Sequence, residues 1–281
     1  MFKIIEKEIL NQNTCKMTIL APDVARRALP GQFIIFRTFA DSERVPLTIA
    51  GYDREGGGVT VIFQTVGAST AELSSREVGE EICDFVGPLG RPSEFEGESR
   101  VAVVGGGLGC AIAYPQAKYL HDCGTPVDVI AGFRNREAVI LEDEMRAASD
   151  NIRIMTDDGS YGEAGLVTEG LRKNIEEGAV YSRVIAIGPP IMMKFICALT
   201  AEYSIPTTVS LNPIMIDGTG MCGGCRLTVG GQTKFACVDG PDFDGHLVDF
   251  DAAIARAGAY REFERKRHDD CRLLKEPKTD A

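Results

Sequence analysis

Arg100-Val-Ala-Val-Val-Gly105-Gly-Gly-Leu-Gly109-Cys-Ala-Ile-Ala113 predicts a buried strand, a glycine-rich turn and the start of a helix built from small residues. A pyrophosphate needs this order, because the backbone must come close to the phosphates and the helix N–H groups must point at the anion. The turn departs from the G-x-G-x-x-G fingerprint, since position 110 is cysteine. The stretch therefore predicts a nucleotide-binding α/β unit without the ordinary fingerprint.

The residues downstream of this stretch alternate between predicted strands and predicted helices. We expect strands at 127–132, 152–156 and 183–188, and helices at 138–147, 165–174 and 192–202. Such alternation predicts a parallel sheet with helices on its faces. We therefore assign residues 99–210 to a nucleotide-binding α/β domain.

Glycines follow three of the predicted strand ends, at the edge where an open parallel sheet binds ligands. Each glycine alone could serve tight packing, but three such places at one edge favour a bound nucleotide. The residues expected to contact it are Gly105, Gly106, Gly107, Gly109, Arg134, Gly188 and Pro189.

Residues 1–98 carry shorter predicted strands, at 2–9, 15–20, 31–37, 46–50, 58–64 and 81–86, separated by glycine and proline. Short strands with this punctuation predict an antiparallel β-barrel. Between the last two strands, Val66-Gly-Ala-Ser-Thr-Ala-Glu-Leu73 predicts a helix start with Ser69 or Thr70 as its N-cap. A helix start preceded by glycine suits a phosphate, although most capped helices bind nothing.

A third pattern is Asp217-Gly-Thr-Gly-Met-Cys222-Gly-Gly-Cys225, followed by Cys237. Plant-type [2Fe–2S] ferredoxins use a C-x4-C-x2-C run with a more distant fourth cysteine. Asp217 stands where the first cysteine would, and its carboxylate keeps the negative charge although oxygen suits iron less well than thiolate. The pattern predicts a [2Fe–2S] region at 211–248 with ligands Asp217, Cys222, Cys225 and Cys237.

Two other interpretations of this loop stay open. A structural zinc ion could be bound by three cysteines and one oxygen ligand. Zinc ribbons usually have two Cys-x2-Cys knuckles, however, and the other six cysteines form no second knuckle. Alternatively, Asp217 is only a turn residue and a solvent-derived ligand completes the site.

Composition indicates a soluble globular chain. Its 281 residues are 44% hydrophobic, which is enough for two modest domains, and no run approaches the roughly 20 apolar residues of a membrane span. Charged residues from Lys3 onward argue against a signal peptide. Nine cysteines, three of them in one loop, favour a reducing compartment and predict a cytoplasmic location. The net charge of −11 disfavours nucleic acid, anionic membranes and acidic partners unless basic side chains gather locally.

The order of barrel, nucleotide domain and cysteine loop resembles the ferredoxin–NADP reductase superfamily. Within it, the chain resembles the branch of dihydroorotate dehydrogenase electron-transfer subunits and small subunits of NADH-dependent ferredoxin:NADP oxidoreductases, also described as sulfide dehydrogenases. The resemblance covers residues 1 to about 250. Aspartate in place of the first cysteine points to the bifurcating oxidoreductases. The motifs that carry the resemblance are Pro46-Leu47-Thr48, Gly67-Ala-Ser-Thr70, Gly87-Pro-Leu-Gly90, Gly105-Gly-Gly-Leu-Gly109 and the segment from Asp217 to Gly245.

The resemblance implies that FAD lies between the first two domains and that the glycine loop at 105–109 serves NAD(H). It implies an isoalloxazine bordered by Pro46, Leu47 and Thr48, a ribityl chain contacted by the strand with Ile62, Phe63 and Gln64, and a pyrophosphate at Gly67, Ser69 and Thr70. Relatives usually place an arginine directly before the proline, whereas this chain has Val45 there and Arg44 one residue earlier.

The resemblance also implies a heterodimer or larger complex, with a large flavoprotein partner that carries further iron–sulfur clusters and through which ferredoxin exchanges electrons. NADH gives two electrons as hydride, FAD accepts both, and the cluster passes them singly. NADH is expected on this subunit, although Arg134 and Arg136 could pair with a 2′-phosphate. No catalytic residue is named, because His121, His246 and His268 are scattered.

Residues 249–281 form the last predicted region. Asp249 or Asp251 caps a helix, a charged stretch follows at 261–272, and the tail from Pro277 is a solvated terminus or a clasp for a partner subunit. The alternatives in function are the electron-transfer subunit of dihydroorotate dehydrogenase, a subunit of a sulfide dehydrogenase or hydrogenase complex, and a zinc-stabilised interaction module without catalysis.

Overall fold

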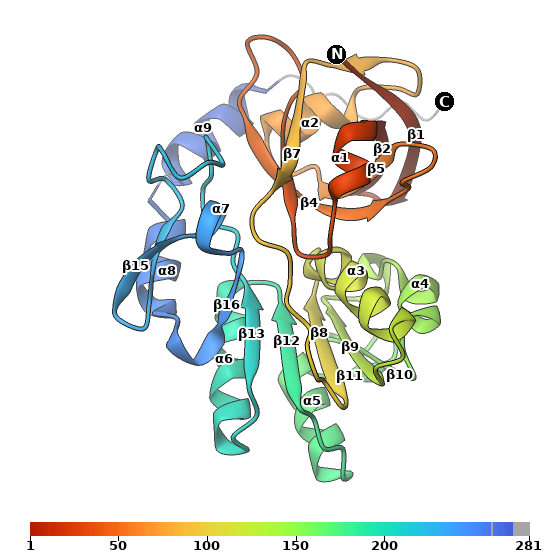
Figure 1. Cartoon of the computed structure of the whole chain (residues 1–281), viewed down its shortest axis with the longest axis vertical. Helices are drawn as coiled ribbons and strands as arrows, with labels where there is room; N and C mark the ends of the chain where they lie inside the picture. The colour runs from red at the N-terminus through yellow and green to blue at the C-terminus, as the bar shows by residue number, and fades with distance from the viewer. Residues whose placement is uncertain (260, 272–281) are drawn as a thin grey trace.

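Figure 1 shows the chain as a computed structural model that describes residues 1–259 and 261–271. The N-terminal part is one antiparallel sheet with the strand order β6-β1-β2-β5-β4-β3-β7. Only Cys83 separates β6 from β7, so the sheet curls back on itself into a nearly closed barrel. The strands are β1 (Phe2–Asn11), β2 (Thr14–Leu20), β3 (Phe33–Arg37), β4 (Val45–Tyr52), β5 (Gly58–Gln64), β6 (Glu81–Ile82) and β7 (Asp84–Leu89).

Strand β3 is buried on both faces, which is why its sequence is apolar without alternation. Ile34 and Phe36 point into the barrel, and Phe33 and Ile35 point outward into a second core that they share with the rest of the chain. Successive side chains of a strand face opposite sides, so one short strand belongs to both cores. This strand therefore joins the barrel to the core shared by the α/β and cysteine-rich regions.

Two helices accompany the barrel. Helix α1 (Pro22–Arg27) begins with proline and was not predicted. Helix α2 (Ala68–Ser74) starts before either expected cap, so the prediction that Ser69 or Thr70 caps it is wrong. The N-cap is Gly67, and the Thr70 hydroxyl accepts from the backbone N–H groups of Val66 and Gly67 at 3.2 Å each.

The second sheet confirms the predicted parallel α/β architecture. Its strand order is β11-β10-β9-β8-β12-β13-β16, and β16 alone among these described strands runs antiparallel to its neighbour. The strands are β8 (Val101–Gly106), β9 (Val127–Phe133), β10 (Asn151–Thr156), β11 (Glu163–Ala164), β12 (Arg183–Ile187), β13 (Thr207–Ser210) and β16 (Asp242–Asp244). The last of these strands comes from the cysteine-rich region, which is thereby joined to the sheet.

Helices cover both faces of this sheet (Figure 1). Helices α3 (Gly109–Asp122) and α4 (Glu142–Ala147) pack on one face, and α5 (Val167–Glu176) and α6 (Pro190–Glu202) on the other. The helix predicted at 138–147 is shorter than expected. Residues Arg136–Ala138 form a 3-10 turn η1, and Leu141 adopts a left-handed conformation (φ 56°) that separates it from α4.

The C-terminal part consists of the hairpin β14 (Arg226–Val229) and β15 (Gln232–Phe235), helix α7 (Ala236–Asp239), the 3-10 turn η2 (Gly245–Leu247), and helices α8 (Phe250–Ala257) and α9 (Arg261–Asp270). The predicted cap at Asp249 is confirmed, because its carboxylate accepts from Ala252 N at 3.0 Å. The predicted tail from Pro277 lies outside the described residues. No helix in the described ranges is both long and apolar enough to cross a membrane.

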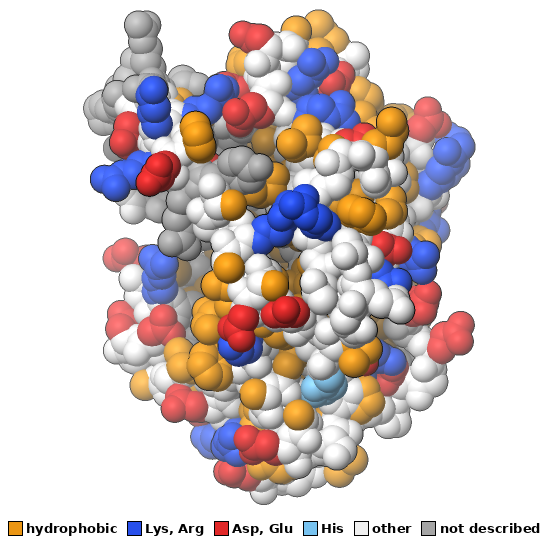
Figure 2. All heavy atoms as spheres, turned by 90° about the vertical axis from the view of Figure 1, so that its left-hand side faces the viewer, with side chains coloured by type: hydrophobic (Ala, Val, Ile, Leu, Met, Phe, Trp, Pro, Cys, Tyr) orange, Lys and Arg blue, Asp and Glu red, His pale blue; other side chains and the backbone are white. Residues whose placement is uncertain are grey.

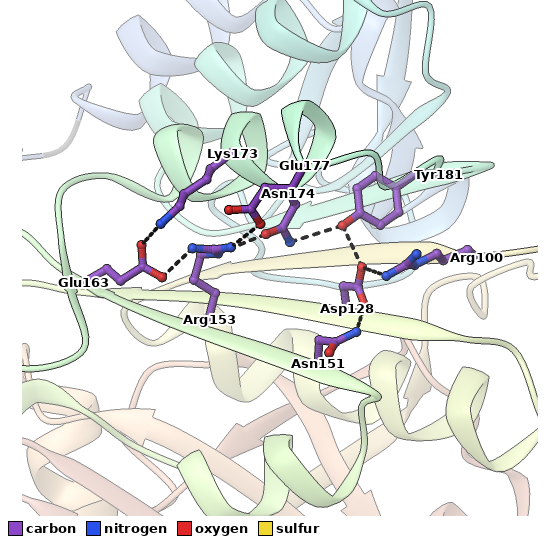
Figure 3. Close-up of polar contacts among 9 residues, drawn as sticks. All are labelled: Arg100, Asp128, Asn151, Arg153, Glu163, Lys173, Asn174, Glu177 and Tyr181. Carbon is purple, nitrogen blue, oxygen red and sulfur yellow. Dashed lines mark hydrogen bonds and ion pairs between the residues drawn. The ribbon is translucent and has the colours of Figure 1, made fainter.

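A partly buried polar network, centred on the buried Asp128, holds α5 against the start of the parallel strands (Figure 3). Asp128 of β9 is 2% exposed and accepts hydrogen bonds from Arg100 at 2.7 Å, Asn151 at 2.9 Å and Tyr181 at 2.7 Å. Burial, followed by the bond to Asp128, raises the pKa of Tyr181. Next to this group, Arg153 of β10 bonds to Asn174 at the end of α5 at 2.9 Å. The network fixes the end of the parallel sheet at which the strands begin, opposite to their carboxyl ends.

We expect Asp128→Ala to lower the free energy of unfolding by at least about 2 kcal/mol, because buried donors lose a charged acceptor. Chemical denaturation measures this loss. Asp23→Ala is the control: its carboxylate is 88% exposed and pairs with the exposed Arg26, so its loss costs within about 0.5 kcal/mol. Equal losses for the two variants would contradict a stabilising role for the network.

Candidate cofactor sites

A large cleft opens at the carboxyl ends of the parallel strands. Its volume is about 1590 Å³. Seven residues predicted to bind cofactors line it: Gln64, Gly106, Gly107, Gly109, Arg134, Gly188 and Pro189. The β1–β2 turn at residues 11–14, which the sequence analysis did not identify, closes the barrel side of the cleft. The structure therefore brings three strand ends and part of the barrel round one cavity.

The first turn of the cleft explains the glycine pattern. A Cβ on Gly109 would lie 2.2 Å from the carbonyl oxygen of Ile187, so only glycine lets α3 approach β12 this closely. Gly107 has φ +56°, and nothing lies within 4 Å of where its Cβ would be. A left-handed backbone facing open space at the start of a helix is a cradle that fits a pyrophosphate.

Cys110, which interrupts the usual fingerprint, is a packing residue. Its sulfur would lie 2.8 Å from a Cβ on Gly105, so the thiol fills the space beneath the turn. Gly105 itself is buried and does not line the cleft. Burial raises the pKa of Cys110 to about 12, which keeps the thiol protonated and unreactive at neutral pH.

Charged side chains in the cleft differ in whether they already have a partner in the described part of the chain. Arg172 pairs with Glu202 at 3.3 Å, and Glu169 accepts from Leu166 N at 2.8 Å. Arg134 forms no ion pair within the described part of the chain, so its charge is available to a ligand. Asp157 also lines the cleft. The cleft thus offers a ligand both a cation and a carboxylate.

The residues next to these charges are held in place by local contacts. Arg136 lies over the Tyr161 ring at 5.4 Å. Asp158 is a turn residue: the Ser160 backbone N–H donates to its carboxylate, and hydrogen bonds from Ser160 lower its pKa. Neither residue is among those that line the cleft.

The residues predicted to contact the isoalloxazine and the ribityl chain lie on strands β4 and β5 of the barrel. Pro46, Leu47 and Thr48 are half-buried at the start of β4. Phe63 points into the barrel interior and is 1% exposed, so only its backbone faces outward. Ile62 is buried among side chains beneath α3. The β4 residues therefore keep accessible surface that the two β5 residues lack.

Helix α2 has an anion already in place at its start. Ser69 Oγ donates to Glu43 Oε2 at 3.0 Å, and Thr70 Oγ1 donates to Gly67 O at 3.0 Å. The Glu43 carboxylate occupies the hydrogen-bond donor of Ser69. The Ser69 hydroxyl thus fits an anionic group, which would have to displace Glu43.

The cysteine loop gathers three thiols and a carboxylate. The sulfur atoms of Cys225 and Cys237, both buried, lie 3.2 Å apart. Cys222 is exposed, and its sulfur accepts from Gly224 N at 3.4 Å. Asp217 Oδ2 accepts from Thr219 N at 2.9 Å and from a second backbone N–H, that of Met221, at 3.0 Å. One thiol pair is thus buried, and the other two donors lie nearer the surface.

The glycines of the loop meet specific conformational needs. Gly218, Gly220 and Gly223 have φ of 82°, 87° and 67°, a region that favours glycine. A Cβ on Gly218 would also lie 2.7 Å from Ile35 Cδ1 of β3. The loop therefore packs directly on the outer face of the barrel strand that is buried on both sides.

Hydrogen bonds and burial shift the pKa values of the loop side chains in opposite directions. The Gly224 N–H lowers the pKa of Cys222, whereas burial and the Cys225 contact raise that of Cys237 to about 12. Hydrogen bonds from Thr219 and Met221 lower the pKa of Asp217. Thiolate is the form that binds metal.

The pairing of the four donors fits a binuclear centre. A single zinc ion needs its ligands to converge on one point. A [2Fe–2S] centre instead divides its ligands between two irons. Three thiols and a carboxylate that meet as one buried pair and two outer donors fit the second arrangement.

Arg44, one residue out of place for the usual barrel arginine, bonds to the cysteine loop. Its Nε donates to the carbonyl oxygen of Ile216 at 3.0 Å. Because side chains alternate along an extended chain, a one-residue displacement turns a side chain to the opposite face. The guanidinium therefore links the start of β4 to the residue before Asp217.

Known proteins match most of this chain, and a family model matches this loop in particular. Residues 212–249 match the family model described as the iron-sulfur cluster binding domain of dihydroorotate dehydrogenase B. A Clostridium beijerinckii protein, described as an uncharacterized protein in the adh 3′ region, is 51% identical over 95% of this chain and 93% of its own length. The dihydroorotate dehydrogenase B (NAD(+)) electron transfer subunit homolog of Thermotoga maritima is 44% identical over 94% and 93%.

A solved structure is similar over nearly its full length. It is the structure of an NADH-dependent reduced ferredoxin-NADP oxidoreductase, described for its insights into flavin-based electron bifurcation. Sequence identity is 42%, the TM-score is 0.90, and the match covers 95% of this chain and 96% of that one.

We expect iodoacetamide to alkylate Cys222 of the iron-depleted chain on the order of tenfold or more faster than Cys110 at pH 7, because only Cys222 is both exposed and lowered in pKa. Peptide mass mapping measures both rates. Cys123, which is also exposed, is the comparison for accessibility. Equal rates at Cys222 and Cys110 would contradict the assignment.

Proposed function

Because the chain belongs to the family of dihydroorotate dehydrogenase B electron-transfer subunits and their homologues, we propose that it is the electron-transfer subunit of an electron-bifurcating NADH-dependent ferredoxin:NADP oxidoreductase. The full-length similarity to the solved oxidoreductase structure carries this proposal. Asp217 in place of a first cysteine supports the same branch. Dihydroorotate dehydrogenase is the second candidate, favoured by the family match of residues 212–249.

Three cofactors are proposed, with a site for each. NAD(H) occupies the cleft, with its pyrophosphate at Gly107 and Gly109. FAD lies at Pro46, Leu47 and Thr48, and its pyrophosphate takes the place of Glu43 at Ser69. Asp217, Cys222, Cys225 and Cys237 hold a [2Fe–2S] cluster. NADH supplies two electrons as hydride, a flavin accepts both, and an iron–sulfur cluster carries one at a time.

Packing of the loop on the barrel supports electron transfer between flavin and cluster. Ile35, against which Gly218 packs, lies directly opposite Pro46 in the β3–β4 ladder. Arg44 joins the same two regions through the Ile216 carbonyl. Only one strand therefore separates the proposed flavin residues from the proposed cluster loop. The protein contributes position and electrostatics here rather than an acid–base pair.

A large flavoprotein with further iron–sulfur clusters is the proposed partner, and ferredoxin exchanges electrons through it. A reducing, cytoplasmic compartment suits the thiolates that the cluster needs. Affinity purification of the tagged chain from its native cells tests the partner. Recovery of a catalytic dihydroorotate dehydrogenase subunit instead would select the second candidate.

Anaerobically purified protein is expected to show flavin absorption, about two irons per chain and the EPR signal of a reduced [2Fe–2S] centre. The same sample is analysed for metals, visible absorption and EPR. Asp217→Ala should lower the iron content, and Asp23→Ala, which removes an exposed carboxylate of helix α1, should not. A colourless protein with one zinc per chain would make the loop a structural clip and end the electron-transfer proposal.

NADH is expected to be preferred over NADPH, because two carboxylates, those of Glu137 and Asp157, line the cleft together with Arg134 and disfavour an added 2′-phosphate. The ratio of kcat/KM values for the two nucleotides measures the preference. Arg134→Gln should weaken NADPH use more than NADH use. A preference for NADPH above about tenfold, worth ~1.4 kcal/mol, would reverse the assignment.

A further inference from the structure

Four arginines surround the cysteine loop, and each donates a hydrogen bond to one of its backbone carbonyls. They come from separate places in the fold: before β4, after β7, at the start of β14 and within α8. We call these side chains the arginine collar. Its bonds run from Arg44 Nε to Ile216 O at 3.0 Å, Arg91 Nε to Val238 O at 3.1 Å, Arg226 Nη1 to Gly223 O at 3.1 Å, and Arg256 Nη2 to Gly224 O at 3.1 Å.

Each of the four carbonyls belongs to a residue that is next in sequence to a different proposed ligand, namely Asp217, Cys222, Cys225 or Cys237. Four guanidinium groups, three of them from residues outside the loop, therefore bond to the backbone beside the four proposed ligands. None of the sequence patterns predicted this arrangement, because a bond to a backbone carbonyl leaves no residue signature at the acceptor.

The collar keeps its positive charge. A guanidinium has five N–H donors and stays ionised, so one carbonyl bond neutralises nothing. None of the four arginines forms a salt bridge within the described part of the chain. Figure 2 shows basic side chains beside hydrophobic ones in the middle of the face that bears α8 and β15. This local charge contrasts with the net charge of −11.

We infer that the collar raises the reduction potential of the cluster by offsetting its negative charge, an inference that rests on the proposed [2Fe–2S] site. Three thiolates, a carboxylate and two sulfides outweigh two ferric ions, so the centre is an anion that gains one more negative charge on reduction. A nearby cation stabilises the more negative, reduced state. Because Cys225 and Cys237 are buried, solvent screens this attraction incompletely.

A purely structural collar, which only holds the loop, makes a different prediction. Glutamine keeps an N–H donor at the place of the arginine Nε but removes the charge, whereas lysine keeps the charge and loses the planar fork. Arg91 is exposed and bonds through Nε, so it suits this comparison. Arg226 is also exposed but bonds through Nη1, beyond the reach of glutamine, so its glutamine variant loses both the charge and the bond. Arg26→Gln on α1 is the matched control, since that arginine is exposed and bonds to no carbonyl of the loop.

The experiment is a potentiometric titration of the holoprotein in its complex, followed by the EPR signal of the reduced cluster. In Arg91→Gln and Arg226→Gln, the ratio of reduced to oxidised cluster at a fixed ambient potential should fall by up to about tenfold, which is ~59 mV for one electron. Arg91→Lys and Arg226→Lys should stay close to wild type, as should Arg26→Gln. Iron content is measured on every sample.

Three results would overturn the inference: glutamine variants that titrate at the wild-type potential, glutamine and lysine variants that shift equally, or equal loss of iron from both. Each would reduce the collar to a support for the loop. Loss of iron from the glutamine variants alone would support a charge effect on the bound cluster. A wild-type protein without a [2Fe–2S] signal contradicts the proposed function instead, before any variant is compared.

Discussion

One continuous hydrophobic core fixes the positions of all three proposed cofactor sites. It runs from Phe33 and Ile35 on the outer face of β3, through Cys225 and Cys237, to the side chains between the parallel sheet and α5 and α6. Because close-packed interiors deform little, the barrel, the cysteine loop and the cleft cannot shift independently without opening this core. The loop is therefore placed by apolar contacts that its own cysteines help to make.

The core also explains why the loop is rich in glycine, which has no side chain. Where the loop meets β3, even the Cβ of an alanine at 218 would collide with Ile35, so close approach requires glycine. A chain without side chains at such points needs other anchors. The arginines supply these anchors by bonding to the carbonyls of the loop. Near Cys222, the side chains of Met221 and Ile216 are 87% and 56% exposed. Rigidity comes from within the chain, and the outer edge of the loop stays open.

Sequence patterns predicted the parts of this arrangement that are local. The strand, turn and helix from Arg100 to Ala113 and the cap at Asp249 depend on neighbouring residues alone. The cap of α2 was wrong because Ser69 and Thr70 resemble caps, whereas the bond from Gly67 N to Thr70 Oγ1 decides the start. The β1–β2 turn reaches the cleft only through tertiary packing. Such contacts leave no periodicity or spacing to detect.

Net charge was equally uninformative about the charge at the loop. A chain with a net charge of −11 was expected to disfavour acidic partners unless basic side chains gathered locally, and four arginines gather at the cysteine loop. Coulomb attraction falls with distance and is screened over about 10 Å, so the nearest charges outweigh the distant majority. An anionic centre that must accept a further electron needs cations close by, whatever the sum over the chain. The electrostatic potential at the proposed cluster therefore depends on where each arginine lies in relation to the ligands, and not on the number of arginines in the chain.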